Sequence, residues 1–298
     1  MEKVLVTGSK GFLGTAVTKR LSQMGHEICG VDIDVVDVCN QSLFLSVCMD
    51  FKPKVIFHLA GLTGMPQSVL APADYFSANV DTTISVLEAC RKISGMRIVY
   101  ASSSAVYGEH KLPSREPDKL PPPENPYAAT KQTSENLIHM YSKLYGFPAV
   151  ALRVFSTFGP RQKEYTALFK FVDSIVQEKP LILFDDGLAK RDYVYVDNCV
   201  DGMMLALNHR EGYDVFNLAQ GENSSLIDIV KLLESIIGKT ANIQFEISPR
   251  GALSSMPASV DKIREKWGYD PAISFKVGLE KLVQWYLEYK GEKNDEWT

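Results

Sequence analysis

The feature that most constrains the fold of this chain is a regular alternation of short apolar runs with helix-like segments through its first half. The runs are "KVLVT", "EICGVD", "KVIFHLA", "RIVYASS" and "AVALRVF", and segments with helical periodicity lie between them. Strands that alternate with helices predict a parallel sheet with helices on both faces. Runs such as "VIFHLA", apolar at consecutive positions, are typical of strands covered on each side. The sequence therefore predicts an α/β fold with a doubly wound parallel sheet.

The alternation becomes less regular beyond about Gly159, where shorter strands and helices predict a smaller second lobe. We expect residues 1–158, with a segment returning near 192–219, to form the first domain. Residues 159–191 and 220–298 are expected to form a smaller α/β lobe. The stretch "LPSREPDKLPPPENP" has the composition of a linker, but strand-helix alternation resumes after it. We interpret it as a loop over the carboxyl edge of the sheet, where such folds bind ligands.

Composition and charge exclude several classes of partner. The 298 residues carry a formal net charge of −4 with no basic run, so neither nucleic acid nor an anionic membrane is expected to bind. Apolar runs have only strand length, and the N-terminus enters a strand without a cleavable leader, which favours a cytoplasmic protein with no membrane partner. Five scattered cysteines without a CxxC pair are typical of buried thiols in a reducing compartment, not of disulfides or a metal site.

A glycine-rich turn follows the first predicted strand. Gly8, Gly11 and Gly14 in "VLVTGSKGFLGTAV" stand between that strand and a predicted helix over about 11–24. Glycines at this place let backbone amides approach a pyrophosphate, and the N-terminus of the helix offers free N–H groups. The alternative is a turn that serves only tight strand-helix packing. A P-loop is excluded because no lysine follows the last glycine.

Asp32 lies at the end of the second predicted strand, in "ICGVDID". A carboxylate there accepts hydrogen bonds from the ribose hydroxyls of adenosine and repels a 2′-phosphate, so it favours NAD over NADP. The alternative is a residue that merely ends a strand.

Tyr127 and Lys131 in "NPYAATKQTSENL" share one face of a predicted helix, because they are four residues apart. A tyrosine has a pKa of about 10, so acting as a base near pH 7 requires about 4 kcal/mol. A lysine cation about 4 Å away, at an effective dielectric constant near 20, supplies about that much. The pattern therefore predicts a catalytic tyrosine with its lysine, and the alternative is a solvated surface pair.

Three serines end the fourth predicted strand, in "VYASSSAVYG". Ser102, Ser103 and Ser104 are expected at the carboxyl edge of the sheet, where a hydroxyl can bond an oxygen that changes between alcohol and ketone. The alternative is that they are ordinary turn residues.

Eight segments carry a resemblance to a known family. They are "VTGSKGFLG", "VIFHLAG", "SANV", "VYASSSAVYGE", "NPYAATKQTSE", "RVFSTFGPRQ", "RDYVYVDN" and "FNLAQGENSSL". In this order they resemble the extended short-chain dehydrogenase/reductase superfamily, and within it the NAD-dependent epimerase/dehydratase family that modifies nucleotide sugars. The resemblance extends to about Trp285. It implies a Rossmann-type doubly wound parallel sheet that binds NAD, with a smaller α/β lobe that binds a nucleotide-sugar substrate.

The resemblance also implies roles for individual residues. Tyr127 matches the general acid/base, Lys131 its tuner and a ribose ligand, and Ser103 the usual Ser/Thr, with Ser104 as the second candidate. The positions that match the family's cofactor contacts are Gly8, Gly11, Phe12, Leu13, Gly14, Asp32, Asp37, Val38, Leu59, Ala60, Gly61 and Asn79. Ser104, Ser156, Arg191 and Arg250 match substrate positions, the two arginines as bidentate ligands of a diphosphate. The alternative for each arginine is a surface ion pair.

Three positions depart from the family pattern. Ala105 stands where relatives that dehydrate or decarboxylate have an acid, so a group that moves a proton at C5 is missing. Ser156 replaces the usual asparagine of "FNVYGP". Ala252 stands where an aspartate is common. The first departure disfavours dehydration, and the other two leave the sugar open.

The expected function is NAD-dependent C4 epimerisation of a nucleotide sugar, most simply a UDP-hexose, through a transient 4-keto sugar. The alternative is an NAD(P)H-dependent reductase of a nucleotide-linked 4-keto-6-deoxy sugar. A non-catalytic dinucleotide-sensing or RNA-binding relative would show a degraded catalytic set, which Ser103, Tyr127 and Lys131 do not. Relatives often form homodimers through the helix after Asn79 and the helix that holds Tyr127, so a homodimer is expected.

Overall fold

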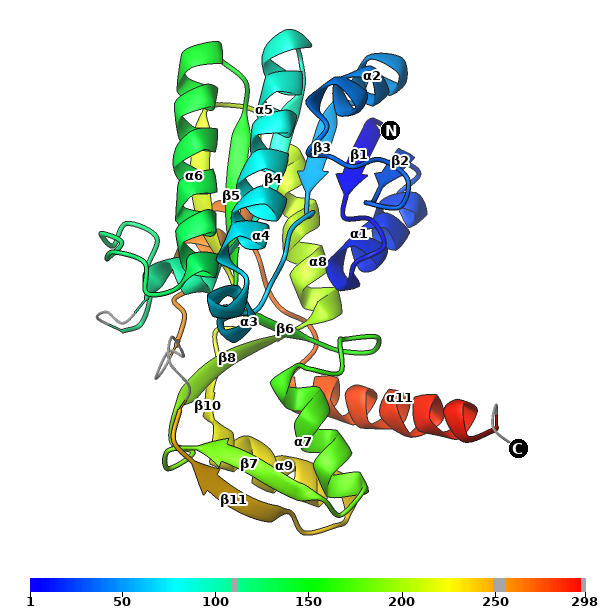
Figure 1. Ribbon diagram of the computed structural model, residues 1–298, viewed down its shortest axis with the longest axis vertical. Helices are drawn as coiled ribbons and strands as arrows, with labels where there is room; N and C mark the ends of the chain where they lie inside the picture. The colour runs from blue at the N-terminus through cyan, green and yellow to red at the C-terminus, as the bar shows by residue number, and fades with distance from the viewer. Residues whose placement is uncertain (109–111, 249–255, 296–298) are drawn as a thin grey trace.

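A six-stranded parallel sheet forms the centre of the larger part of the molecule (Figure 1). The computed structural model describes residues 1–108, 112–248 and 256–295. The strand order is β2-β1-β3-β4-β5-β9, and every neighbouring pair is parallel. The strands are β1 (Lys3–Thr7), β2 (Glu27–Val31), β3 (Val55–His58), β4 (Arg97–Ser103), β5 (Ala149–Val154) and β9 (Tyr213–Leu218). The predicted doubly wound α/β fold is confirmed.

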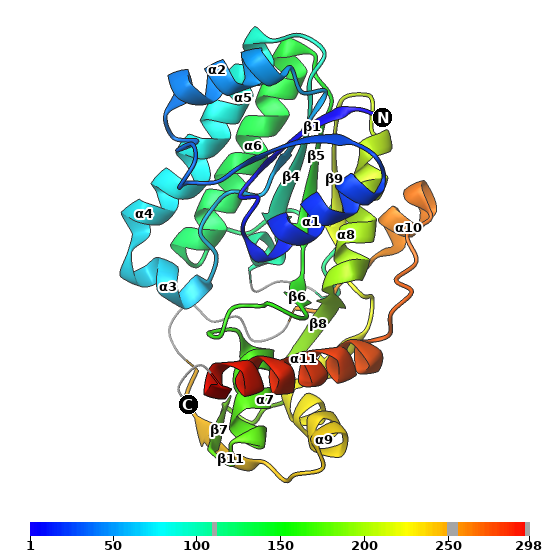
Figure 2. The same cartoon turned by 90° about the vertical axis from the view of Figure 1, so that its right-hand side faces the viewer.

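Helices cover both faces of this sheet (Figure 2). One face carries α1 (Phe12–Gln23) and α8 (Val196–Leu205), and the other carries α2 (Gln41–Phe51), α5 (Thr82–Lys92) and α6 (Pro126–Tyr145). Val4 and Val6 of β1 belong to one hydrophobic cluster with Val17 of α1, whereas Leu5 belongs to a second cluster with Phe44 of α2. The strands are therefore buried on both sides, which explains their nearly continuous apolar sequence.

A smaller lobe lies beyond the carboxyl ends of the strands (Figure 1). It contains a three-stranded sheet of β10 (Asn223–Ser225), β8 (Lys190–Tyr195) and β6 (Ser156–Phe158), and a two-stranded sheet of β11 (Asn242–Glu246) and β7 (Pro180–Phe184). Three helices pack there: α7 (Ala167–Val176), α9 (Leu226–Ile237) and α11 (Phe275–Asp295). A further helix, α10 (Asp261–Trp267), packs against β9 of the large sheet. The domain boundaries given above stay a prediction.

Short helical turns and one long loop surround the carboxyl edge of the large sheet. After β3 come α3 (Met65–Leu70), α4 (Pro72–Phe76) and a π-helical turn, Ser77–Asp81, and after β4 comes a 3₁₀ turn, Ser104–Tyr107. The proline-rich loop lies against this edge, because Glu116 accepts a hydrogen bond from Asn217 N (2.7 Å) and Gln132 donates to Pro121 O (3.0 Å). Within the described ranges, no helix combines the length and the apolar character needed to cross a membrane.

Candidate active site

The glycine turn between β1 and α1 folds back on itself. Gly8 has φ +68°, and Gly11 N donates to Gly8 O at 3.0 Å. A Cβ on Gly14 would lie 1.9 Å from Gly8 O, so no side chain fits there. Helix α1 begins with Gly11 as its N-cap, and no side chain caps it. The turn thus leaves helix N–H groups open to a ligand and fits the pyrophosphate of a dinucleotide.

Asp32 directly follows β2 and lies beside this turn. Its carboxylate accepts hydrogen bonds from Lys10 N (2.8 Å) and Ile33 N (2.9 Å), while Lys10 Nζ is paired with Asp34. The glycine turn and the acid are therefore joined by a hydrogen bond from the backbone amide of Lys10 to the Asp32 carboxylate. A carboxylate oxygen accepts more than one hydrogen bond, so Asp32 still has acceptor capacity for ribose hydroxyls.

Asp37 and Val38 follow in the loop after β2. Asp37 is exposed, and its carboxylate accepts a hydrogen bond from Cys39 N (2.9 Å). The side chain of Val38 is buried in the core beneath α2. A contact of Val38 with adenine is thus limited to its backbone.

The loop after β3 is held to β1. Thr7 Oγ1 accepts hydrogen bonds from Leu59 N and Ala60 N, both at 3.2 Å. Gly61 has φ +148°, and a Cβ there would lie 2.5 Å from Asn79 Oδ1. The loop can therefore run this close to its neighbours only with glycine at position 61.

Asn79 supports the same loop from behind. It is 1% exposed, its Oδ1 accepts from Leu62 N (2.7 Å), and its Nδ2 donates to Leu62 O (3.2 Å) and Thr130 Oγ1 (2.9 Å). Both ends of the Asn79 amide therefore form hydrogen bonds that connect the loop to α6. Asn79 was predicted to line the cofactor, and the structure places it one layer behind the loop.

Tyr127 and Ser103 meet where α6 begins and β4 ends. Helix α6 starts at Pro126, with the side chain of Asn125 accepting a hydrogen bond from Ala128 N (2.9 Å) as its N-cap. This cap places Tyr127 in the first turn, next to the sheet edge. Tyr127 and Ser103 line the same cleft, and the Ser103 side chain lowers the pKa of Tyr127. The predicted acid/base and its hydroxyl partner are therefore brought together.

Lys131 lies one turn further along α6, and its amine is fixed. Nζ donates to Ala101 O at 2.8 Å and lies 4.8 Å from the centre of the Tyr100 ring. Burial lowers the pKa of Lys131 to about 8, and the charge of Glu135 opposes this shift.

One electrostatic expectation is wrong for the protein chain by itself. The lysine was expected to lower the pKa of Tyr127, but burial raises this pKa to about 12, and the opposing effect of the Ser103 side chain is smaller. The reason is desolvation, which disfavours a phenolate, together with the aim of the lysine amine at Ala101 O and not at the phenol. Activating Tyr127 near neutral pH thus needs positive charge beyond that of Lys131.

The three serines after β4 have separate partners. Ser102 Oγ donates to the buried carboxylate of Glu135, Ser103 Oγ accepts from Ala105 N (3.2 Å), and Ser104 Oγ contacts Met256 Sδ at 3.8 Å. Ser103 and Ser104 both line the cleft, so each can reach a substrate. Of the two, only Ser103 acts on the pKa of Tyr127, which favours it for the catalytic role.

These groups line one cleft of about 350 Å³ between the sheet edge and the smaller lobe. The predicted site residues that line it are Gly8, Gly11, Phe12, Leu13, Gly14, Leu59, Gly61, Ser103, Ser104, Tyr127, Lys131 and Ser156. Those placed outside its lining are Asp32, Asp37, Val38, Ala60, Asn79 and Arg191. The glycine turn and the Ser-Tyr-Lys set therefore share a single cleft.

Residues 4–219 match the NAD dependent epimerase/dehydratase family. The chain belongs to this family. It is 33% identical to an uncharacterised UDP-glucose epimerase of Bacillus subtilis (strain 168), over 97% of this chain and 100% of that protein. It is 30% identical to the UDP-glucuronate 4-epimerase of Thermodesulfobacterium geofontis (strain OPF15), over 95% of this chain and 96% of that protein.

Solved structures give the same family assignment. The UDP-glucuronic acid 4-epimerase of Bacillus cereus, in complex with UDP-glucuronic acid and NAD, has a TM-score of 0.89 and 30% identity, covering 96% of this chain and 99% of that one. The UDP-glucose 4-epimerase of Thermus thermophilus, in complex with NAD, has a TM-score of 0.88 and 28% identity, with the same coverage. The predicted membership of the epimerase/dehydratase family, with NAD as its cofactor, is confirmed.

Several residues of this epimerase/dehydratase cleft escaped prediction. They are Thr63, Gly64, Met65, Thr157, Gln162, Lys163, Tyr165, Thr166 and Met256. Thr63 Oγ1 and Tyr165 OH lie 3.3 Å apart and connect the loop after β3 to the loop after β6. The ring of Tyr75 packs edge-on against that of Tyr127, with centroids 6.2 Å apart. The sequence signal was weak, since most of these residues lie outside the segments that carried the family resemblance.

Of the two predicted substrate arginines, the structure describes Arg191 only. Arg191 lies on β8, and its Nη1 donates to Lys190 O at 3.0 Å. It belongs to the smaller lobe and lies outside the lining of the cleft. Arg250 lies outside the described residues, as does Ala252.

Proposed function

We propose that the protein is an NAD-dependent 4-epimerase of a UDP-sugar, either a UDP-hexose or the corresponding uronic acid, working through a transient 4-keto sugar. The observation that carries this proposal is that Ser103, Tyr127 and Lys131 line the same cleft as the glycine turn. The relatives from Bacillus subtilis and Thermodesulfobacterium geofontis are named as epimerases of UDP-glucose and UDP-glucuronate. Both names point to the same class of substrate.

The chemistry assigns one task to each residue. Tyr127 takes the proton from the C4 hydroxyl and returns a proton to the C4 oxygen after the sugar has presented its other face. Ser103 hydrogen-bonds that oxygen in both its alcohol and its ketone form. Lys131 stabilises the phenolate of Tyr127 and is proposed to donate to a ribose hydroxyl of the cofactor. NAD, when bound in the cleft, would accept the C4 hydride and NADH would return it, and the positive charge of NAD would add to that of Lys131.

Ala105 supports epimerisation over dehydration. It packs in an apolar cluster with Tyr75, Tyr127 and Ala128. A family member that dehydrates needs a group here that moves a proton at C5, and a methyl group cannot do so.

The proposal extends to the surroundings of the reaction. Arg191 and Arg250 are proposed to bind the diphosphate, and Asp32 the adenosine ribose.

We further propose that the protein is a cytoplasmic homodimer. Met140 and Leu144, which are both exposed and lie one turn apart on α6, are proposed to lie in its interface. Sedimentation velocity of the wild type and of Met140→Glu would test the dimer. A monomeric wild type would contradict it.

The test of function is proton NMR of the purified protein with a panel of UDP- and dTDP-sugars and no added cofactor. A new anomeric signal from a C4 epimer is expected with one UDP-sugar, because an epimerase regenerates its NAD in each turnover. No conversion in any tube, together with NADH consumption on a 4-keto sugar, would replace the epimerase with a reductase. No conversion under either condition would favour a non-catalytic relative.

A further inference from the structure

One buried acid next to the catalytic set has no part in the reaction described above. Tyr127, Lys131 and Glu135 follow one another at intervals of four along α6, and all three side chains are buried. They form a column that runs from the cleft into the interior. Glu135 ends the segment "NPYAATKQTSE", and neither the acid/base step nor cofactor binding uses it.

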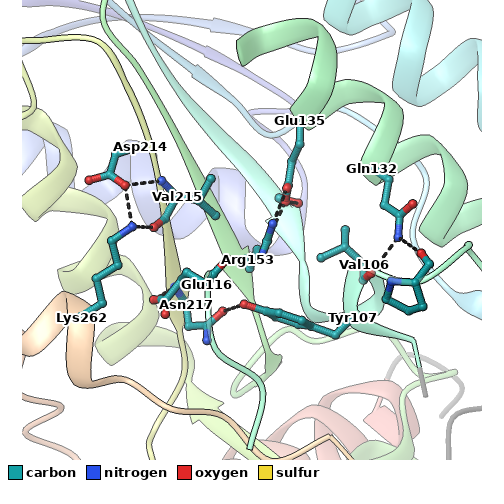
Figure 3. A network of polar contacts seen from close by, with 12 residues as sticks. Val106, Tyr107, Glu116, Gln132, Glu135, Arg153, Asp214, Val215, Asn217 and Lys262 are labelled. Carbon is teal, nitrogen blue, oxygen red and sulfur yellow. Dashed lines mark hydrogen bonds and ion pairs between the residues drawn. The ribbon is translucent and has the colours of Figure 1, made fainter. Parts of the chain in front are cut away.

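Glu135 is held on both of its oxygens. Arg153 of β5 donates through Nη2 to Oε2 (2.8 Å) and through Nε to Oε1 (3.1 Å), and the two side chains are each 6% exposed (Figure 3). Ser102 Oγ donates to Oε1 as well. Ser102 directly precedes Ser103, so the carboxylate connects α6 to the end of β4.

Arg153 is anchored in turn. Its guanidinium lies 4.8 Å from the centre of the Tyr107 ring, and the Tyr107 hydroxyl donates to Asn217 Oδ1 at 2.7 Å (Figure 3). The 3₁₀ turn after β4, strand β5 and strand β9 are thus joined around one ion pair. Burying such a pair contributes little net stability compared with apolar residues, so its presence one turn from Lys131 points to a role in the site.

The groups that face Lys131 come from three elements. They are Tyr100 from β4, Tyr127 and Glu135 from α6, and His58 from β3, with Arg153 beyond Glu135. Burial lowers the pKa of His58 to about 3, so this ring is neutral at pH 7. Burial raises the pKa of Tyr100, so its hydroxyl is neutral as well. Among the described groups that act on Lys131, Glu135 is the one negative charge.

We propose that Glu135, clamped by Arg153, is a positioning residue that keeps Lys131 charged and aimed at the cleft during the reaction. The proposal rests on the epimerase function proposed above. Lys131 must carry a charge to stabilise the phenolate, and burial alone works against that charge. A fixed carboxylate one turn away offsets the desolvation without reaching the substrate. Arg153 holds the carboxylate in this orientation through its two hydrogen bonds.

The test replaces charge while retaining shape. Glu135→Gln removes the negative charge and leaves the cation of Arg153, so Lys131 should lose its proton at a pH at least one unit lower than in the wild type. Glu135→Asp keeps the charge and is the control, with the pH of titration unchanged. The titration is followed by NMR of ¹³Cε-labelled lysine, with the signal assigned by its loss in Lys131→Met. This readout needs no substrate, so it is independent of whether the proposed function is right.

Activity provides the second readout. The alkaline limb of the kcat profile should move to lower pH in Glu135→Gln by the same amount as the lysine titration, with KM changed less than kcat. If Glu135→Gln does not fold, the double variant Glu135→Gln/Arg153→Gln exchanges the ion pair for two neutral amides. In this double variant Lys131 should also lose its proton at a lower pH than in the wild type, but the shift should be smaller than in Glu135→Gln. An unchanged lysine titration in the variant that folds, or a shifted titration with an unshifted kcat profile, overturns the proposal.

Discussion

Lys131 Nζ lies 5.9 Å from the centre of the Tyr127 ring, one helical turn further into the protein. Its bond to Ala101 O fixes the amine between the helix and the end of β4. Ser103, at the end of the same strand, lines the cleft together with Tyr127 and lowers its pKa. One strand end thus positions both members of the helical pair, so the geometry of the site depends on how α6 packs on β4.

The first prediction concerns the hydroxyl of Tyr127. We expect Tyr127→Phe to lower kcat by about 100- to 10,000-fold, because it removes the group that transfers the proton. Binding of NAD should change little, since the ring remains in place. The measurement is epimer formation by NMR, with cofactor content determined by absorbance.

The control for this variant lies on the same helix. Tyr141 OH bonds Glu88 Oε1 (3.0 Å) near the far end of α6. Tyr141→Phe should retain wild-type turnover. Equal activity in the two variants would remove Tyr127 from the reaction.

The second prediction concerns the stability cost of Lys131. The pKa of its amine is about 8 in the folded chain, whereas the ordinary value for a lysine is 10.5. Between these values the unfolded chain binds more protons, so stability rises with pH, and below pH 8 the full cost is present. We expect Lys131→Met to abolish turnover and to raise the free energy of unfolding at pH 7 by about 2 kcal/mol, after the lost hydrogen bond is subtracted.

Urea unfolding at pH 7 and pH 10 checks the sign of this effect. The stability gain of Lys131→Met over the wild type should shrink as the pH rises through the window from 8 to 10.5. A gain that stays constant across this window would mean that burial of the charge is not its cause. Control measurements on Lys143→Met are expected to show no pH-dependent gain, because Lys143 is exposed near the end of the same helix.

The sequence predicted those parts of the site that depend on local patterns. The spacing of Tyr127 and Lys131 and the turn at Gly8 are contained within single segments, and helical or strand periodicity is enough to place them. Tyr165 and Met256 lie in segments far along the chain, and they reach the cleft only because the smaller lobe packs on the sheet edge. The pKa of Tyr127 was mispredicted for a related reason, since burial depends on the whole assembled site.

The third prediction concerns the choice of cofactor. Asp32→Ala should weaken NAD binding by about 10- to 100-fold, the usual effect of losing hydrogen bonds to a charged acceptor. NADP binding should weaken less, because the variant also removes a repulsion. The measurement is the Kd of each cofactor by calorimetry on protein freed of bound nucleotide.

Asp34→Ala is the matched control for Asp32. Asp34 is two residues away, exposed and paired with Lys10 Nζ. This variant changes the local charge by the same amount without altering the predicted ribose acceptor. Equal losses of NAD and NADP affinity in Asp32→Ala, or the same change in both variants, would remove Asp32 from the ribose.

The fourth prediction separates a supporting role of Asn79 from a contact with the cofactor. Its amide carries the hydrogen bonds of Leu62 N and Thr130 Oγ1 in a fully buried position. Asn79→Ala leaves these groups without their partner, and an orphaned buried group costs about 1–3 kcal/mol. We therefore expect the free energy of unfolding of cofactor-free protein to fall by at least ~2 kcal/mol. Ser156→Ala, at a residue that lines the cleft from β6, should stay within ~0.5 kcal/mol of the wild type. If Asn79→Ala kept its stability but bound NAD more weakly, this amide would contact the cofactor. If Asn79 instead holds the loop against which the cofactor rests, both the stability and the NAD affinity should fall.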